Sequence, residues 1–209
     1  MRNEPVPDFT KSIGKDIKGM KIGICYIDHM KLRSTPVEKA VNNAGAVFSS
    51  LGADVKTVPL SDQLKDEAIL TPDYAISVYT VVKRGEVSSN LGRYDGIRYG
   101  HDRSNFGAEA KRRIMLGTFT LSKGYADRYY VKAQQVRSLY IKNFQQLFST
   151  FDVLISPTSP GFALKLGASK NSPMFGELED MLLEPSSIAG LPGINVPCFH
   201  DKKTNLYLG

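Results

Sequence analysis

The order of apolar and polar positions over the first 60 residues predicts two strands with a helix between them. Residues 20–26 form a compact apolar run with β-branched side chains, which is typical of a buried strand. A helix is expected to begin after Thr35, with Pro36 at its first position, because threonine caps free backbone N–H groups and proline fits the first turn. It should end near Leu51, and the alternating stretch 54–60 follows as a second strand. Parallel strands joined by such a crossover helix indicate an α/β fold.

Helical periodicity dominates the middle of the chain. Three helices are predicted, over residues 71–91, 109–122 and 125–148, and a loop rich in glycine and tyrosine occupies 93–100. In the last of these helices the apolar residues form one stripe at three- or four-residue spacing: Tyr129, Ala133, Val136, Tyr140, Phe144 and Leu147. An apolar run at 152–156, closed by prolines, predicts another buried strand.

The last part of the chain carries weaker patterns. Residues 177–183 are a candidate for a short acidic helix, and 185–192 for a helical turn followed by a loop. A further strand is expected at 194–198, before a hairpin turn through 201–205.

Composition narrows the class of protein. With 42% apolar and 23% charged residues the chain is typical of a globular protein. No stretch approaches the roughly 18 uninterrupted apolar residues of a membrane helix, so no membrane association is expected. The two cysteines, Cys25 and Cys198, lack the spacing of a metal site and predict buried thiols in a reduced, cytoplasmic setting.

The formal net charge of +6 is concentrated in one segment. Residues 109–150 hold eight basic side chains against two acidic ones, a net +6 that leaves the rest of the chain neutral in sum. Such a segment could attract RNA. Because no RNA-binding motif with interleaved aromatics accompanies it, a solvated helical face is the favoured interpretation.

No complete catalytic constellation is visible. His29, His101 and His200 lie in loop-like places without metal-ligand spacing, and the adjacent serine pairs are not in glycine-rich turns that could expose a nucleophile. No metal site is expected. The sequence instead offers basic residues at 111–113 and an acidic group around Asp180. An arginine and an aspartate facing one pocket could hold both ends of a free amino acid, but separate surface charges are the simpler interpretation.

Five long runs follow one another along the chain at 90–100, 106–118, 124–137, 152–157 and 188–198, with shorter ones at 5–9 and 19–23. In this order they resemble the amidase-signature family, and within it most closely the A subunits of the amidotransferases that act on Asp-tRNA(Asn) and Glu-tRNA(Gln). The resemblance implies a partial amidase-signature fold, with a mixed β-sheet flanked by helices. It also implies that residues 1–209 are the C-terminal portion of a single domain truncated at both ends, since only five residues join Gly100 to Phe106 and the family's closing strand and helix are missing.

Site residues follow from the same resemblance. The family's serine–serine–lysine triad would precede Met1, so no catalytic residue is expected in this chain, and the chain alone should be inactive. In the amidotransferase branch the substrate is glutamine. By position in the matching runs, Arg113 is expected to bind its α-carboxylate, Asp180 its α-amino group, and Tyr79 to line the same pocket.

The resemblance further implies partners and a place in the cell. The B and C subunits would complete a cytoplasmic complex, in which ammonia released from glutamine converts Glu-tRNA(Gln) to Gln-tRNA(Gln). No cofactor is expected in this chain, because the partner subunit uses ATP and Mg. Two alternatives stay open: a fragment of a general amidase acting on small amides, and a non-catalytic piece that works only with a complementary chain.

Overall fold

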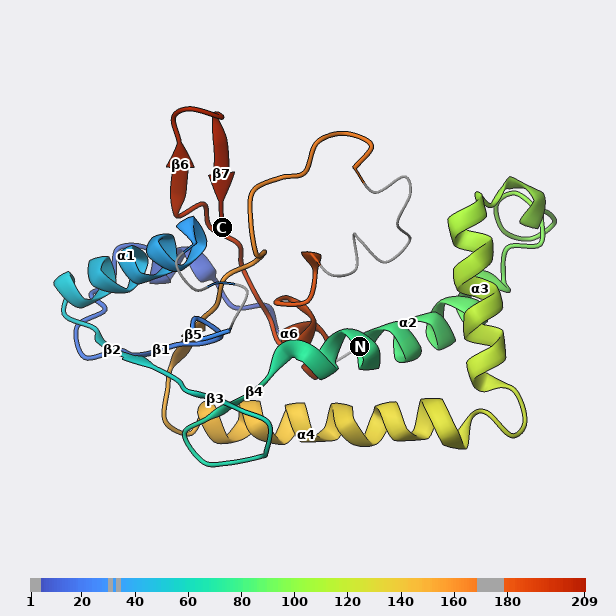
Figure 1. Ribbon diagram of the computed structural model, residues 1–209, viewed down its shortest axis with the longest axis horizontal. Coiled ribbons are helices and arrows are strands. Elements are labelled where there is room, and N and C mark those ends of the chain that lie inside the picture. Colours follow the sequence, from blue (N-terminus) through green and yellow to red (C-terminus); the bar gives the residue numbers. More distant parts are fainter. Residues whose placement is uncertain (1–4, 30–31, 33–34, 169–178) are drawn as a thin grey trace.

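A small parallel sheet forms one end of the molecule. The computed structural model describes residues 5–29, 32, 35–168 and 179–209. Strands β1 (Lys21–Ile24), β2 (Asp54–Thr57) and β5 (Val153–Ile155) lie in the order β2-β1-β5, all parallel. Figure 1 shows this sheet beside α1 (Pro36–Ser50), with the remaining helices extending away from it. The α/β fold predicted from the sequence is confirmed.

Helix α1 forms as its sequence predicts. The Thr35 side chain accepts a hydrogen bond from the backbone N–H of Glu38 (3.3 Å), and Pro36 occupies the first helical position. The helix packs closely on the sheet, since a Cβ added at Gly45 would lie 2.6 Å from the Ile24 side chain. Gly52, at a φ of +90°, lets the chain turn into β2. Together these residues make the expected crossover between β1 and β2.

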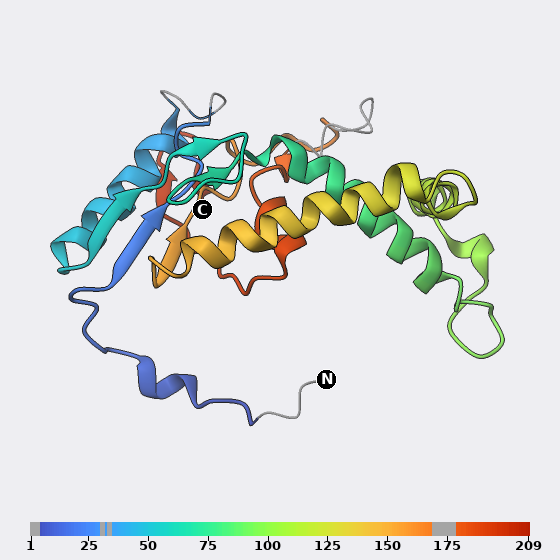
Figure 2. The same cartoon turned by 90° about the horizontal axis from the view of Figure 1, so that it is seen from below.

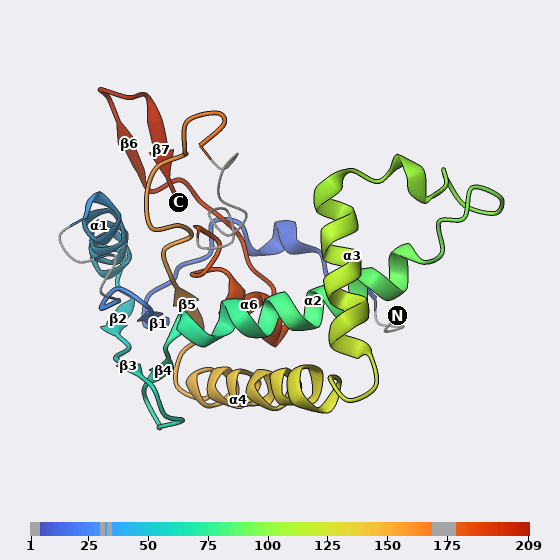
Figure 3. The same ribbon diagram turned by 45° about the vertical axis from the view of Figure 1, so that its right-hand side comes forward.

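Helices make up most of the rest of the described chain. Short 3₁₀ turns also occur: η1 (Phe9–Ser12) lies in the segment before β1, whereas η2 (Pro72–Tyr74) and η3 (Arg103–Asn105) precede longer helices. The longer elements are α2 (Ala75–Leu91), α3 (Ala108–Leu121), the π-helical turn η4 (Asp127–Val131) and α4 (Lys132–Leu147). Figure 3 shows α2 and α4 side by side, while α3 crosses the far end of α2. The three helices predicted for this region are therefore present.

The core follows the apolar stripe of α4. Tyr140, Phe144 and Leu147 are buried there, as the spacing predicts, whereas Tyr129, the first residue of the predicted stripe, lies before α4 and is 44% exposed. Asn143 is buried among them, where its side chain accepts from the N–H of Leu70 (2.9 Å) and donates to the carbonyl of Ala68 (2.7 Å). These bonds tie α4 to the short parallel pair formed by β3 and β4, whose bounds are Leu60–Ser61 and Ile69–Leu70.

The C-terminal part differs from the sequence prediction at one predicted strand and at one predicted helix. Helix α6 (Glu184–Ala189) packs against α2 and α4, and the Arg137 Nε donates to the carbonyl of Ile188 (2.6 Å). The predicted strand at 194–198 is wrong: the strand of the hairpin starts later, at β6 (Phe199–Asp201). Pro197 has no N–H to donate, which explains why pairing fails there.

The closing hairpin itself is confirmed. Strand β6 pairs antiparallel with β7 (Leu206–Leu208), and Asn205 turns between them at a φ of +58°. The antiparallel pair is a separate ladder from the three parallel strands. Of the predicted acidic helix at 177–183, residues 177 and 178 lie outside the described residues, and the chain forms turns from Asp180 to Leu183.

The two ends of the described chain differ in how close they lie to the helices and strands. Figure 2 shows the N-terminal segment that precedes β1 running outward, away from the helices and strands, whereas the C-terminus lies among them. In the described parts of the chain, no helix is long and apolar enough to cross a membrane.

Candidate functional site

Tyr79 lies half-buried on the first half of α2. Its hydroxyl accepts a hydrogen bond from the Lys83 Nζ one turn later, and that ammonium also lies 4.5 Å from the centroid of the ring. The side chain packs against the main core. An ammonium held both at the hydroxyl and over the ring leaves Tyr79 oriented by its own helix.

Arg113 lies on α3 in a three-membered ionic cluster. Its Nε donates to Glu109 (2.6 Å), and Arg112 reaches the same carboxylate through two nitrogen atoms at 2.7 Å each. Hydrogen bonds from Arg112, and then from Arg113, lower the pKa of Glu109 to about 2. Both arginines are about one-third exposed. The two guanidinium groups therefore already hold one carboxylate, that of Glu109, with charge-assisted hydrogen bonds.

Asp180 is exposed, in the turn that leads into α6. Its backbone carbonyl accepts from the N–H groups of Leu183 (2.9 Å) and Glu184 (3.2 Å), which fixes the turn and leaves the side chain toward solvent. Both α3 and α6 pack against α2, the helix of Tyr79. Figures 1 and 3 place α3 at the far end of α2 and α6 nearer the sheet.

Tyr79 lies on α2, and both α3, which carries Arg113, and α6, which follows Asp180, pack against α2. The three predicted side chains are nevertheless not in contact with one another through any hydrogen bond or ion pair between described residues. A glutamine held between them stays a prediction.

A group of hydrogen-bonded polar residues near the start of α2 was missed by sequence reasoning; His29, Thr71 and Tyr140 are buried, whereas Asp73 is exposed. The His29 Nε2 lies 3.3 Å from Asp73, which also accepts a hydrogen bond from the Thr71 hydroxyl (2.6 Å). The Tyr140 hydroxyl donates to the carbonyl of Thr71, and burial raises the pKa of that tyrosine. Because these groups come from distant parts of the sequence, no local motif marks them. They connect the end of β1 to α2 and α4.

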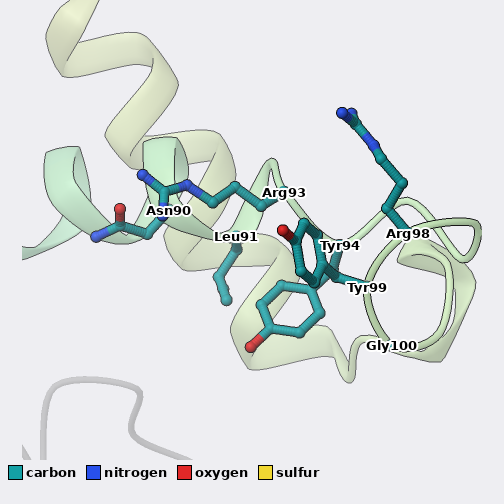
Figure 4. Close-up of a pocket in the computed structure, with 7 residues that line it drawn as sticks. All are labelled: Asn90, Leu91, Arg93, Tyr94, Arg98, Tyr99 and Gly100. Carbon is teal, nitrogen blue, oxygen red and sulfur yellow. The ribbon is translucent and has the colours of Figure 1, made fainter.

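A concave surface lies where α2 ends. It has a volume of about 780 Å³ and is lined by Asn90, Leu91, Arg93, Tyr94, Arg98, Tyr99 and Gly100. In Figure 4 the Tyr94 and Tyr99 rings lie close together, with the Arg93 guanidinium on one side, while Arg98 extends away from the rings. We call this the arginine–tyrosine pocket. In the ranges that the structure describes, no cluster of three or more His, Cys, Asp or Glu side chains suited to a metal ion occurs.

Comparison with known proteins identifies the class. The family model described as Amidase matches residues 1–209. The chain belongs to the amidase family.

Within this family, the chain is similar in sequence to proteins of one kind. The glutamyl-tRNA(Gln) amidotransferase A subunit of Clostridium botulinum (strain Kyoto / Type A2) is 44% identical over 211 residues, covering 94% of this chain and 42% of that protein. The corresponding protein of Geobacter sp. (strain M21) is 40% identical, covering 93% of this chain and 41% of its own length. The chain thus spans about two fifths of the curated relatives it matches.

Solved structures agree with these relatives. The crystal structure of the glutamyl-tRNA(Gln) amidotransferase A subunit from Thermotoga maritima matches with a TM-score of 0.65 and 32% identity, over 93% of this chain and 38% of that one. A bacterial aryl acylamidase of the amidase-signature family matches with a TM-score of 0.67, and at 18% identity it shows the fold alone. The partial amidase-signature fold expected from the sequence is therefore confirmed.

Proposed function

We propose that this chain is part of the A subunit of a glutamyl-tRNA(Gln) amidotransferase, which releases ammonia from glutamine for the amidation of Glu-tRNA(Gln). The observation that carries the proposal is 44% identity to such a protein over 94% of this chain. The chemistry of α3 supports it, because Arg112 and Arg113 grip a carboxylate with charge-assisted hydrogen bonds of 2.6–2.7 Å.

In this proposal the chain supplies the binding side of the site and not the reacting groups. Arg113 binds the α-carboxylate of glutamine, Asp180 binds the α-amino group, and Tyr79 lines the space between them. For this to happen, the substrate carboxylate must share the Arg113 guanidinium with Glu109. An arginine has five N–H donors, so one guanidinium can serve two carboxylates. The exposed turn of Asp180 must also approach α3.

The remaining expectations belong to the complete complex. The B and C subunits are the proposed partners, the complex works in the cytoplasm, and ATP and Mg are used by the partner subunit. The serine nucleophile, the second serine and the lysine would come from the part of the longer protein that precedes this chain.

The test is a kinetic comparison on a complete A subunit that contains this chain, assembled with its partners. We expect Arg113→Ala to raise the KM for glutamine by about 10- to 100-fold, because hydrogen bonds to charged groups contribute about 1.5–3 kcal/mol. Turnover of a simple aliphatic amide, which has no α-carboxylate, should change far less. Asp180→Asn should give the same pattern through the α-amino group.

Arg112→Ala is the matched control, because Arg112 binds the same glutamate from the next position on α3. Unchanged glutamine turnover in Arg113→Ala would refute the pocket assignment. Equal turnover of glutamine and aliphatic amides by the unmodified enzyme would instead favour a general amidase. Activity of the 209-residue chain alone would contradict the proposed absence of the triad.

A further inference from the structure

The arginine–tyrosine pocket has chemistry that the proposed function does not use. Its loop, residues 93–100, interleaves two arginines with two tyrosines. Tyr99 is 62% exposed and Tyr94 is 42% exposed, so their aromatic rings are open to solvent. Within the described residues the Arg93 guanidinium has no hydrogen-bond or ion-pair partner. The pocket thus offers a free cation beside exposed ring faces.

The loop is held in shape by its own contacts. The Asp95 carboxylate accepts hydrogen bonds from the N–H groups of Ile97 and Arg98, both at 2.9 Å, and these bonds lower the pKa of Asp95. Gly96, at a φ of +75°, closes the turn against Asp102. A loop closed in this way presents its side chains at a lower entropy cost than a flexible one.

Further contacts position the rings and the positive charge. Tyr94 packs edge-to-face on Phe106, with ring centroids 6.3 Å apart. The Arg103 guanidinium donates to the carbonyl of Gly92 (3.4 Å), which brings a second cation next to the backbone of Arg93. On the next helix, the Lys111 Nζ donates to the carbonyl of Ser104 (3.4 Å). The pocket is therefore bordered by positive charge from η3 and α3.

We propose that the arginine–tyrosine pocket binds single-stranded RNA, with a phosphate on Arg93 and a base stacked on Tyr99. Arginine forks match phosphate oxygens, and exposed aromatic rings stack on unpaired bases regardless of sequence. The volume of about 780 Å³ is within the range of pockets that take small organic groups. This inference stands on the side chains of one loop and does not depend on the proposed function.

An acidic protein segment is the less favoured partner. It would pair with the arginines but would gain little from two exposed tyrosine rings. A base-paired RNA is also a poor fit, because its bases are already stacked and its ring faces are hidden. The combination of a free guanidinium and open rings favours unpaired nucleotides.

The experiment measures binding of the 209-residue chain to a fluorescein-labelled oligouridylate of about 12 nucleotides, a length typical of single-strand binding sites. Fluorescence anisotropy is recorded over a series of salt concentrations. We expect Arg93→Gln and Tyr99→Ala each to weaken binding about tenfold, in line with the loss of one stacked base or one phosphate contact. Arg93→Gln should also flatten the plot of log K against log salt by about 0.7.

Matched control variants remove a positive charge or a tyrosine ring from surfaces outside the arginine–tyrosine pocket. Lys142→Gln deletes an exposed positive charge on α4, and Tyr207→Ala deletes a tyrosine that is also 62% exposed, on β7. Both should change binding less than about twofold, since neither lies at the pocket. Tyr99→Phe keeps the ring and should keep binding, so that a loss in Tyr99→Ala reports stacking and not misfolding. Circular dichroism spectra of all variants should match.

Three results would each overturn the proposal. One is no binding, or equal losses in the control variants. Another is an oligoglutamate that competes as well as the RNA, which would make the pocket an acidic-peptide site. The third is duplex RNA binding as tightly as the single strand, which would remove any role for the rings.

Discussion

Helices α3 and α4 have similar lengths but are held in place by opposite means. Helix α4 buries five of its side chains, including Tyr140, Phe144 and Leu147. Helix α3 buries only Gly117, and a Cβ added there would overlap the carbonyl oxygen of Arg84 on α2. One helix is anchored by large side chains, the other by the close approach of two backbones. Because α3 is held by its backbone, its charged side chains pair with one another on its surface, as Arg112, Arg113 and Glu109 do.

The largest effect on the free energy of unfolding is expected from removing a buried apolar side chain of α4. Leu147→Ala removes a side chain that is 1% exposed and should lower the free energy of unfolding by about 2–5 kcal/mol. Leu139→Ala on the same helix removes a leucine that is 43% exposed, and should cost about 0.5 kcal/mol or less. Urea unfolding of both variants gives the comparison. Similar losses would show that α4 is not anchored by its buried stripe.

A smaller loss is expected where α3 meets α2. Gly117→Ala gains about 1 kcal/mol of helix propensity, yet the new Cβ forces the two backbones apart. The net result should be a loss of about 1–3 kcal/mol. Gly193→Ala is the control, because a Cβ there meets nothing within 4 Å. If Gly117→Ala proved neutral or stabilising in urea unfolding, the backbone contact would not be what holds α3.

The smallest effect concerns the charges that α3 presents. Glu109 has a folded-state pKa of about 2, below its usual value of 4.5, because Arg112 and Arg113 bind the ionised form. A lowered carboxyl pKa stabilises the fold above about pH 4.5, and this contribution is lost as the pH falls toward 2. With the side chain 53% exposed, the contribution should be below about 1 kcal/mol.

The measurement compares the native chain with Glu109→Gln at several pH values. The difference in unfolding free energy should be present at about pH 7 and shrink between about pH 5 and pH 2. A difference that persists unchanged at the acid end of this range would mean that the carboxylate charge is not its source.

Local chemistry explains which elements could be predicted from the sequence. Thr35 and Pro36 mark the start of α1 because capping depends on neighbouring residues only, and the stripe on α4 depends on spacing within one helix. The strand expected at 194–198 fails for a reason that is also local. Its apolar residues suggested burial, but Ile194 is 91% exposed and Val196 is 61% exposed, and Pro197 cannot donate to a ladder.

The candidate site was less predictable, since it depends on the path of the chain in space. The spacing of Glu109, Arg112 and Arg113 at three and four residues already favours ion pairs on one helix face, yet the family resemblance draws attention to the arginines alone. No spacing tells whether Asp180 approaches α3, because that depends on how α6 packs on α2. The His29–Asp73 contact was hidden for the same reason, as its partners lie 44 positions apart.

The order of the three parallel strands has a consequence for how the chain acquires its structure. Strand β1 is central, and its two neighbours are reached at very different times. Ile22 pairs with Val55 after a short crossover, whereas on its other side it pairs with Val153, in a contact region that spans 131 positions. Closing so long a loop is slow compared with local pairing. During synthesis, one side of β1 must wait until α4 has been made. We expect refolding to show a fast phase for β1–α1–β2 and a slower one when β5 docks.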